Sequence, residues 1–105
     1  MMGRYIFLME CKEGSEEEYI KRHKAVHPEL LQALKAVGVS NYSIFMDGNQ
    51  LYAYMEVDDF DAAMKKLETN PANIKWQEYM SDILGMGDGN NPKMHVISNE
   101  VFHLD

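Results

Sequence analysis

Apolar residues follow two different spacings in the first third of the chain. Residues 4–10 form a short run of mostly apolar, β-prone residues and predict a strand. Apolar residues then return every three or four positions until a glycine interrupts the pattern, which predicts a long helix over residues 16–37. Ser15 and Glu18 have the spacing of a capping box at the start of this helix, and Pro28 predicts a bend within it.

The middle of the chain predicts a β-hairpin. Residues 42–46 and 51–57 are both β-prone, and in the second run apolar residues occupy every other position. One face of this strand is therefore apolar and the other is mixed. The Asp47–Gly48 pair between the two runs is a strong short-range signal for a hairpin turn.

The rest of the chain predicts a second helical region and a last strand. The helical region begins at Asp58 or Asp59 and is interrupted at residues 69–71, after which a further helical segment follows. The composition of residues 85–92 predicts a loop. Residues 94–104 predict the final strand.

These elements occur in the order β-α-β-β-α-β, which predicts one ferredoxin-like α+β domain over residues 1–105. In that arrangement a four-stranded antiparallel sheet carries its helices on one face. A core this small leaves several aromatic rings without a place, namely Phe45, Tyr52, Tyr54 and Phe102. We therefore predict a homodimer in which a second copy covers the open face of the sheet.

Charge and composition narrow the range of partners. The net charge of −7, with only ten Lys and Arg, argues against nucleic acid and against an anionic membrane surface. The single cysteine, Cys11, excludes an internal disulfide and a cysteine-based zinc site. The apolar run Tyr5–Met9 is too short for a signal-peptide core or a membrane span, so we expect a cytoplasmic protein.

Candidate chemistry concentrates in the helix predicted over residues 16–37. Tyr19, His23 and His27 stand four residues apart, which places them along one side of a helix. An imidazole titrates near neutral pH and is the usual proton carrier of active sites. Two interpretations stay open on this pattern alone. Either these side chains pack a polar part of the core, or they carry out proton chemistry in a cleft.

The two histidines also form an H-x-x-x-H pair, a spacing with which one helix can hold a transition metal. In zincins a glutamate directly follows the first histidine, whereas Lys24 follows His23 here and is a poor neighbour for a cation. Further ligands would have to come from Glu29, His95 or His103. Because no spacing rule singles these out, we predict no metal site.

Aromatic residues offer a second kind of site. Trp76 and Tyr79 lie three residues apart, a spacing consistent with core packing, a dimer contact or a flat platform for a sugar ring. Tyr42 begins a predicted strand and Tyr19 a predicted helix, so both hydroxyls can reach one cleft. The glycines at residues 85–89 do not follow a strand, which argues against a phosphate-binding loop.

Five segments, in this order, resemble the L-rhamnose mutarotase family: EEYIKRHKAVHPEL at residues 17–30, GVSNYSIF at 38–45, LYAYMEV at 51–57, KWQEYMSDIL at 75–84 and EVFHL at 100–104. The resemblance spans nearly the whole chain and rests mainly on E-Y-x-x-R-H followed by P-E-L. It implies a small dimeric α+β barrel that interconverts the α and β anomers of a deoxy-sugar, a small monosaccharide, without a cofactor.

The resemblance also implies roles for particular residues. His23 matches the proton donor of such enzymes. Tyr19 and Tyr42 match tyrosines that contact the sugar, and Trp76 matches the first of two consecutive tryptophans in the pocket. We therefore expect His23 and Tyr19 to be catalytic, and the tyrosines and Trp76 to bind the substrate.

Two positions depart from the family pattern within the expected pocket. Gln77 replaces the second tryptophan, and His27 stands where the family often has another. We expect Gln77 to contact the substrate and His27 to form part of the pocket wall, so the type of reaction carries over better than the identity of the sugar. Two other functions stay open: a cofactor-free monooxygenase or haem-handling protein of the same fold, and a non-catalytic sugar-binding module.

Overall fold

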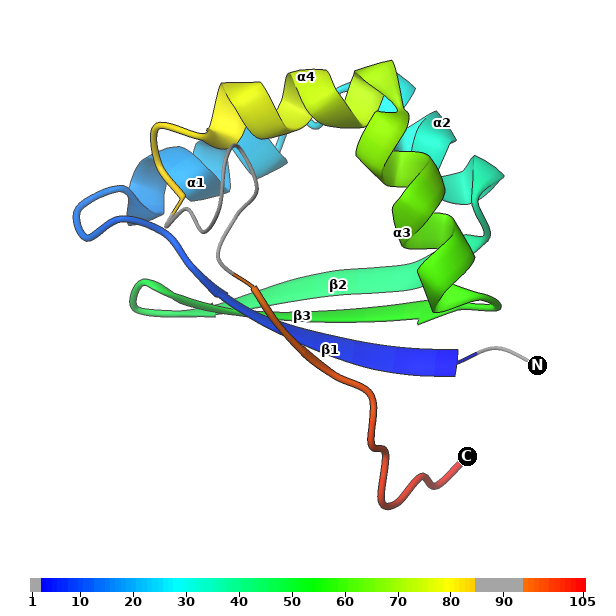
Figure 1. Cartoon of the computed structure of the whole chain (residues 1–105). Coiled ribbons are helices and arrows are strands. Elements are labelled where there is room, and N and C mark those ends of the chain that lie inside the picture. The colour runs from blue at the N-terminus through cyan, green and yellow to red at the C-terminus, as the bar shows by residue number, and fades with distance from the viewer. Residues whose placement is uncertain (1–2, 85–93) are drawn as a thin grey trace.

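The computed structural model describes residues 3–84 and 94–105 (Figure 1). Eight elements follow one another along the chain: β1 (Gly3–Glu10), α1 (Glu16–His23), α2 (Pro28–Ala36), β2 (Val39–Asp47), β3 (Gln50–Val57), α3 (Phe60–Thr69), α4 (Pro71–Met80) and β4 (His95–Ile97). This is the predicted β-α-β-β-α-β order with each helical region divided into two helices. The predicted α+β class is confirmed.

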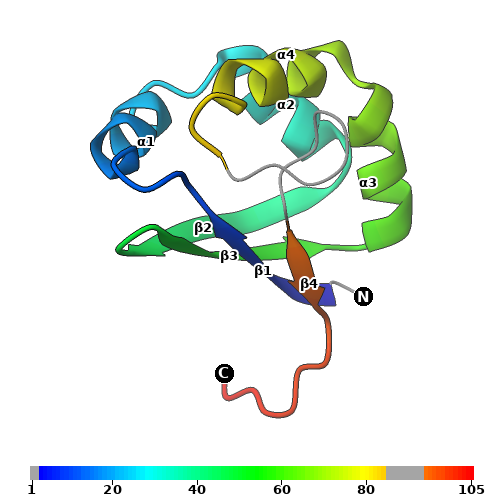
Figure 2. The ribbon, with the colours of Figure 1, turned by 60° about the vertical axis from the view of Figure 1, so that its left-hand side comes forward.

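The four strands form one antiparallel sheet in the order β2-β3-β1-β4. Phe7 in the middle of β1 pairs with Ala53 of β3 on one side and with Val96 of β4 on the other. The four helices of the described residues all lie on the same side of the sheet, and none of these residues forms a helix on the opposite face (Figures 1 and 2). The core therefore fills the space between the helices and one face of the sheet.

The hairpin between β2 and β3 is as predicted, with Gly48 in the left-handed region at φ 60°. An irregularity in β2 was not predicted: the pairing shifts between Ser40 and Ser43, and Asn41 has φ 47°. Asn is one of the few residues that tolerate this conformation. Tyr42 faces the helices on the same side as Ile44, and the bulge allows Val39, before it in the strand, to face the core as well.

The predicted helix over residues 16–37 is wrong in one respect, because it is broken rather than bent. α1 ends at His23, and α2 begins at Pro28 after His27 adopts an extended conformation at φ −56° and ψ 125°. A proline disfavours the helical conformation in the residue before it and fits well at the first position of a new helix. Ser15 does precede α1, but among the described residues its side chain accepts no capping hydrogen bond, so the capping box is not formed.

The predicted last strand is much shorter than expected. β4 pairs with β1 only along Ile6–Leu8, and the chain then leaves the sheet and runs below it (Figures 1 and 2). Val101 and Phe102 are 88% and 78% exposed. The loop predicted over residues 85–92 lies outside the described residues. Within residues 3–84 and 94–105, no helix is long and apolar enough to cross a membrane.

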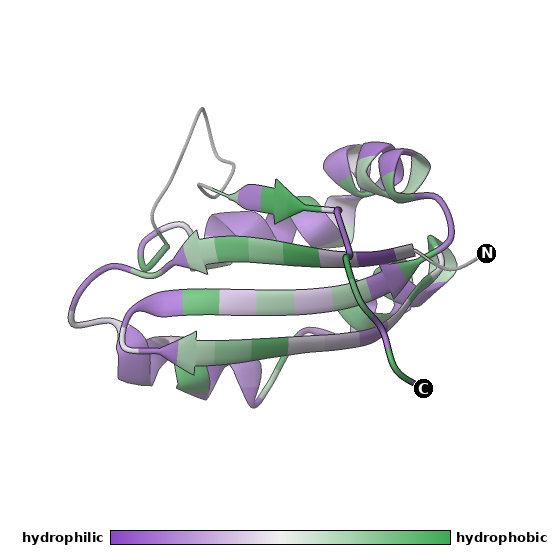
Figure 3. Cartoon of the chain, turned by 90° about the horizontal axis from the view of Figure 1, so that it is seen from below, coloured by the Kyte–Doolittle hydropathy of each residue, from purple (hydrophilic) through white to green (hydrophobic). Residues whose placement is uncertain are grey.

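Figure 3 views the sheet from its side without helices, which we call the open sheet face, and apolar and aromatic residues meet in the middle of this face. Phe45, Tyr52 and Leu8 lie side by side on three neighbouring strands, as do Tyr54 and Ile6 on the two central ones. Phe45 is 67% exposed and Tyr52 42%. The prediction that these aromatic rings lie outside the core is confirmed.

Candidate functional site

Three of the predicted site residues meet where α1 packs against α4. The rings of Tyr19 and His23, one turn apart on α1, stack with their centroids 4.1 Å apart and their planes at 25°. Trp76 of α4 approaches the His23 ring edge-on, with the centroids 5.5 Å apart. Tyr19 and Trp76 are both buried in the same apolar cluster. The His23 ring is thus held between two buried aromatic rings.

One hydrogen bond determines which nitrogen of His23 is available. The distance from His23 Nδ1 to the backbone carbonyl oxygen of Tyr19 is 2.9 Å. A carbonyl oxygen only accepts, so Nδ1 must carry the proton, and Nε2 is the nitrogen left for a ligand. Burial lowers the pKa of His23 below its usual 6.5, and the bond to the carbonyl only partly opposes this. At neutral pH the ring is therefore mostly neutral, with a lone pair on Nε2.

The two predicted tyrosines keep their protons at neutral pH. Tyr19 is 5% exposed, and burial, followed by the nearby Tyr42 phenol, raises its pKa. Tyr42 is 37% exposed as a residue, yet burial around its hydroxyl raises its pKa to about 12. The ring is partly open to solvent, while the titrating oxygen responds to its own enclosed surroundings. Both hydroxyls are therefore hydrogen-bond donors that can also accept.

His23 lines a cavity of ≈ 340 Å³, which we call the His23 cavity. Trp76 and Tyr42 line it as well, and its other walls are aliphatic side chains from α2, β2 and the segment before α2: Val26, Leu30, Leu31, Leu34 and Ile44. This volume lies at the lower end of the range for small-molecule sites, about 300–1,000 Å³. A mostly apolar cavity with one imidazole and one phenol suits a small, uncharged ligand.

A second cavity, of ≈ 410 Å³, lies next to the first, and we call it the Gln77 cavity. Its polar residues are Gln77, Asn73, Glu68 and Tyr42. Tyr42 and Leu34 line both cavities, so the two are neighbours across these side chains. Four of the five predicted site residues line one of the two cavities, and the fifth, Tyr19, supports the His23 ring.

His27 does not lie on the helix face predicted for it, because α1 ends before it. Its ring still contacts Trp76, edge-on with centroids 4.9 Å apart, and Tyr79 at 5.3 Å. It lines a different cavity, of ≈ 560 Å³, together with Asn70 and Lys75. Across the described part of the chain, no three His, Cys, Asp or Glu side chains are grouped so that they could hold a metal ion.

Sequence reasoning missed Arg22, which ties α1 to the end of α4. Its guanidinium donates to Glu18 at 2.7 Å, to both oxygens of Asp82 at 2.8 and 3.1 Å, and to the Tyr79 carbonyl oxygen at 2.6 Å. It also lies 4.5 Å over the Tyr79 ring. The pKa of Arg22 is raised by these hydrogen bonds, first of all by the one to Asp82. The sequence signals only the Glu18 pair, at i−4, because Asp82 is sixty residues away.

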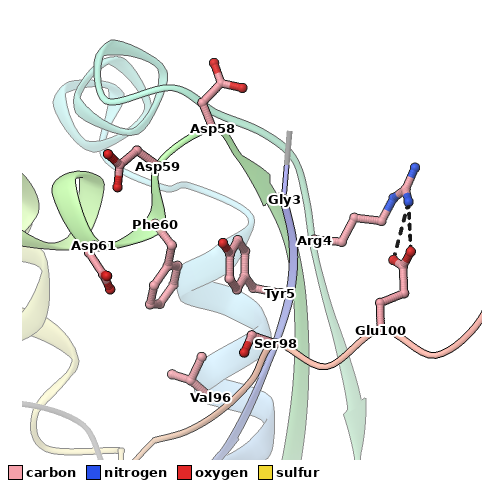
Figure 4. Close-up of a pocket in the computed structure, with 10 residues that line it drawn as sticks. All are labelled: Gly3, Arg4, Tyr5, Asp58, Asp59, Phe60, Asp61, Val96, Ser98 and Glu100. Carbon is pink, nitrogen blue, oxygen red and sulfur yellow. Dashed lines mark hydrogen bonds and ion pairs between the residues drawn. The ribbon is translucent and has the colours of Figure 1, made fainter. Parts of the chain in front are cut away.

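A larger cavity of ≈ 940 Å³ lies away from these residues, between β1, the start of α3 and the C-terminal segment (Figure 4). None of the predicted site residues lines it. Three of its polar residues already have partners: Arg4 pairs with Glu100 at 3.1 Å, and Asp59 accepts a capping hydrogen bond from the Ala62 amide. Size alone therefore does not mark a functional site, and the surroundings of His23 remain the candidate site.

Comparison with known proteins shows which family the chain resembles. A sequence model of the family described as L-rhamnose mutarotase matches residues 4–104. A protein of Listeria monocytogenes named L-rhamnose mutarotase is 42% identical over 105 residues, covering 98% of this chain and 99% of the relative. The crystal structure of an L-rhamnose mutarotase from Formosa agariphila superposes with a TM-score of 0.85 at 36% identity, over 97% of this chain and 98% of that one.

More distant structures share the fold alone. A dimeric ferredoxin-like protein from an uncultured marine organism superposes with a TM-score of 0.65 at 17% identity, over 100% of this chain and 99% of that one. The ferredoxin-like architecture predicted from the order of the elements is thereby confirmed.

Proposed function

The chain belongs to the L-rhamnose mutarotase family, and from this premise we propose that it speeds the exchange between the α and β anomers of L-rhamnose, with His23 as the group that moves the protons. One observation carries the role of His23. Its Nδ1 is committed to the Tyr19 carbonyl oxygen, and the ring borders a cavity of suitable size with Nε2 available. A buried imidazole held in one tautomer is a good general base.

The reaction needs one proton to leave the anomeric hydroxyl and one to reach the ring oxygen. Both oxygens are bonded to C1, so a single imidazole beside C1 can serve both. Neutral His23 takes the anomeric proton on Nε2, the bond between C1 and the ring oxygen breaks, and the imidazolium gives the proton to that oxygen. The open aldehyde rotates about its C1–C2 bond, and the reverse steps close the other anomer. His23 then acts as the predicted proton donor only after it has accepted a proton.

The neighbouring residues have supporting roles in this proposal. Tyr19 holds the His23 ring by stacking and by its backbone carbonyl, and its hydroxyl contacts the sugar. Tyr42, at the boundary of the two cavities, donates a hydrogen bond to a sugar oxygen. Trp76 offers apolar surface to the C–H groups of the sugar ring. The reaction neither oxidises nor reduces its substrate, so these side chains suffice without a redox cofactor.

The other two functions left open by the sequence receive less support. Relatives named as mutarotases match over the full length of the chain, whereas no such match names a monooxygenase at comparable identity among those described above. A sugar-binding module would bind L-rhamnose without speeding anomer exchange. The experiment below separates that outcome from catalysis.

The test is saturation-transfer NMR of L-rhamnose anomers with the wild-type protein and with His23→Asn. Asparagine can keep a donor near the position of Nδ1 while it removes Nε2, so the fold should survive. General acid–base catalysis contributes about 10²–10⁴-fold, so exchange should fall by about a hundredfold or more. His103→Asn, on an exposed residue of the C-terminal segment, is the matched control and should keep wild-type exchange. Wild-type exchange in folded His23→Asn would contradict the proposal.

We also propose that the protein is a homodimer joined through the open sheet face. The row formed by the exposed Phe45 and Tyr52 and the half-buried Leu8 is the kind of apolar surface that marks an interface. A C2 pairing would bring this self-complementary surface against its copy.

The one cysteine, Cys11, is buried and unpaired, which suits a reducing compartment such as the cytoplasm.

A further inference from the structure

Gln77 carries an unpaired acceptor in the interior of the protein. Its Oε1 atom is buried and has no hydrogen-bond partner among the described residues. Among the described residues, no other buried side-chain nitrogen or oxygen lacks a hydrogen-bond partner. A buried acceptor that has lost water without gaining a partner is destabilising, so native proteins rarely contain one without a reason.

The neighbouring hydrogen bonds determine which end of the Gln77 amide is unpaired. Asn73 Nδ2 donates to the Leu67 carbonyl oxygen at 3.0 Å, so Asn73 turns its Oδ1 toward Gln77. Gln77 Nε2 donates to that oxygen at 3.4 Å. Reversing the Gln77 amide would set two acceptor oxygens against each other. The missing partner of Gln77 is therefore a hydrogen-bond donor.

The surroundings indicate what kind of donor fits. Gln77 lines the Gln77 cavity, where Glu68 adds a second acceptor and most of the remaining wall is apolar, including Phe7, Met9, Met55 and Met64. Tyr42 is part of the wall of both this cavity and the His23 cavity. A molecule with hydroxyl donors on one side and C–H surface on the other matches both the acceptors and the apolar wall, and a monosaccharide has this character.

We propose that Gln77 is a specificity-determining residue that selects the substrate by accepting a hydrogen bond from one particular sugar hydroxyl. This inference rests on the proposed function, because it requires that the sugar undergoing anomer exchange reaches into the Gln77 cavity. A sugar that lacks the hydroxyl leaves Oε1 unpaired. Sites built to bind a substrate hydroxyl discriminate strongly against analogues without it.

The experiment compares wild-type protein with Gln77→Met, which keeps the length of the side chain and removes the acceptor. The substrates are L-rhamnose, its 2-, 3- and 4-deoxy analogues, and L-mannose, which has a hydroxyl at C6 where L-rhamnose has a methyl group. The measured quantity is kcat/KM for anomer exchange by NMR. Gln32→Met, on an exposed residue of α2 that lines neither sugar cavity, is the matched control.

Gln77→Met should lower kcat/KM by about tenfold or more for every sugar that bears the selected hydroxyl. It should not lower kcat/KM further for a sugar without that hydroxyl, which the wild-type protein already handles about tenfold less well. A donor at C2, C3 or C4 singles out one deoxy analogue as the unaffected sugar, and a donor at C6 leaves L-mannose as the one affected sugar. An equal effect on all five sugars, or no effect on any, would overturn the inference.

A second measurement covers the case in which Gln77→Met does not fold. In wild-type protein titrated with L-rhamnose and L-mannose, the side-chain carbonyl ¹³C shift of Gln77 should move as it accepts the hydrogen bond, while that of Gln32 stays in place. An unmoved Gln77 signal at saturating sugar would overturn the inference. If the wild-type protein moves the Gln77 signal but exchanges no anomers, the proposed function fails and the hydroxyl contact stands.

Discussion

Removal of the Tyr19 hydroxyl distinguishes a catalytic from a structural role for the α1 aromatic pair. Tyr19→Phe keeps the ring that stacks on His23 at 4.1 Å. It also keeps the backbone carbonyl that fixes the tautomer of His23, because that oxygen belongs to the main chain. The substitution therefore changes only what the hydroxyl itself contacts.

The expected magnitudes differ for stability and for activity. Tyr19 is buried, and a phenylalanine ring fills nearly the same volume as the tyrosine ring. The free energy of unfolding of Tyr19→Phe should therefore differ from that of the wild-type protein by less than about 1.5 kcal/mol. One hydrogen bond between uncharged partners contributes about 0.5–1.5 kcal/mol. If the hydroxyl binds the sugar, kcat/KM should fall by about 2- to 13-fold, since about 1.4 kcal/mol corresponds to a factor of ten.

The assay is anomer exchange of L-rhamnose by NMR at several sugar concentrations, with thermal unfolding followed by circular dichroism. Tyr5→Phe is the control, because the Tyr5 ring also stacks on another ring, that of Phe60, at 4.5 Å, but lies at the other cavity. Unchanged kcat/KM in Tyr19→Phe would mean that this residue only packs the core. A loss of kcat/KM above about a hundredfold would also refute the proposed role, because the Tyr19 hydroxyl would then transfer a proton itself rather than only bind the sugar.

Three further predictions concern pH, the Arg22 contacts and the open sheet face. Burial lowers the pKa of His23 below 6.5, and the neutral ring starts the reaction. We therefore expect kcat/KM to rise as the pH increases through the lowered pKa and to be level above pH 6.5. A fall of kcat/KM with increasing pH would contradict the role of neutral His23 as the base. Arg22→Lys loses the two-point contact with Asp82, so both kcat and the melting temperature should fall, whereas Arg4→Lys at an exposed pair should leave both in place. Phe45→Asp should give a monomer by light scattering, and a dimer of unchanged mass would exclude this face as the interface.

The pH dependence of stability has the same origin. The unfolded chain binds a proton at His23 more readily than the folded protein does, because the folded pKa is lowered. The contribution of neutral His23 to stability is therefore fully present above pH 6.5 and is lost as the pH falls through the lowered value. His23→Asn should remove this part of the pH dependence of the melting temperature.

Much of the fold follows from local patterns in the sequence. The hairpin between β2 and β3 depends on a turn at Gly48, which the Asp47–Gly48 pair predicts. The alternation of apolar residues in β3 indicates which face of this strand is buried. From the sequence, Pro28 predicts a bend in one helix, whereas the structure has two separate helices. Whether the chain resumes in the same direction after a proline depends on what the next helix packs against, and local sequence does not specify this. β4 likewise stops at Ile97 although β1 continues to Gly3, and no local signal in the sequence marks the point where the chain leaves the sheet.

The site was predictable where it is local and not where it is assembled from distant segments. Spacing alone placed Tyr19 beside His23, and the structure confirms this contact. No spacing rule brings Trp76 to the same ring from α4, and only the family resemblance indicated it. Tyr42 faces the helices together with Ile44, as alternation along residues 42–46 indicates. The bulge at Asn41, which brings Val39 to the same side, is a backbone irregularity that alternation does not reveal. The roles of these residues in catalysis stay predictions.

Arg22 and His23 illustrate how neighbouring residues acquire different tasks. Adjacent positions on a helix point about 100° apart, so one side chain of this pair turns to the end of α4 while the other turns to the cavity. Arg22 holds α1 against α4 through Asp82 and the Tyr79 carbonyl oxygen, and the same docking sets His23 against Trp76. A substitution at Arg22 therefore acts through the position of the His23 ring. It should change the rate of proton transfer without changing the pH at which His23 titrates, and this separates a positioning residue from one that exchanges protons itself.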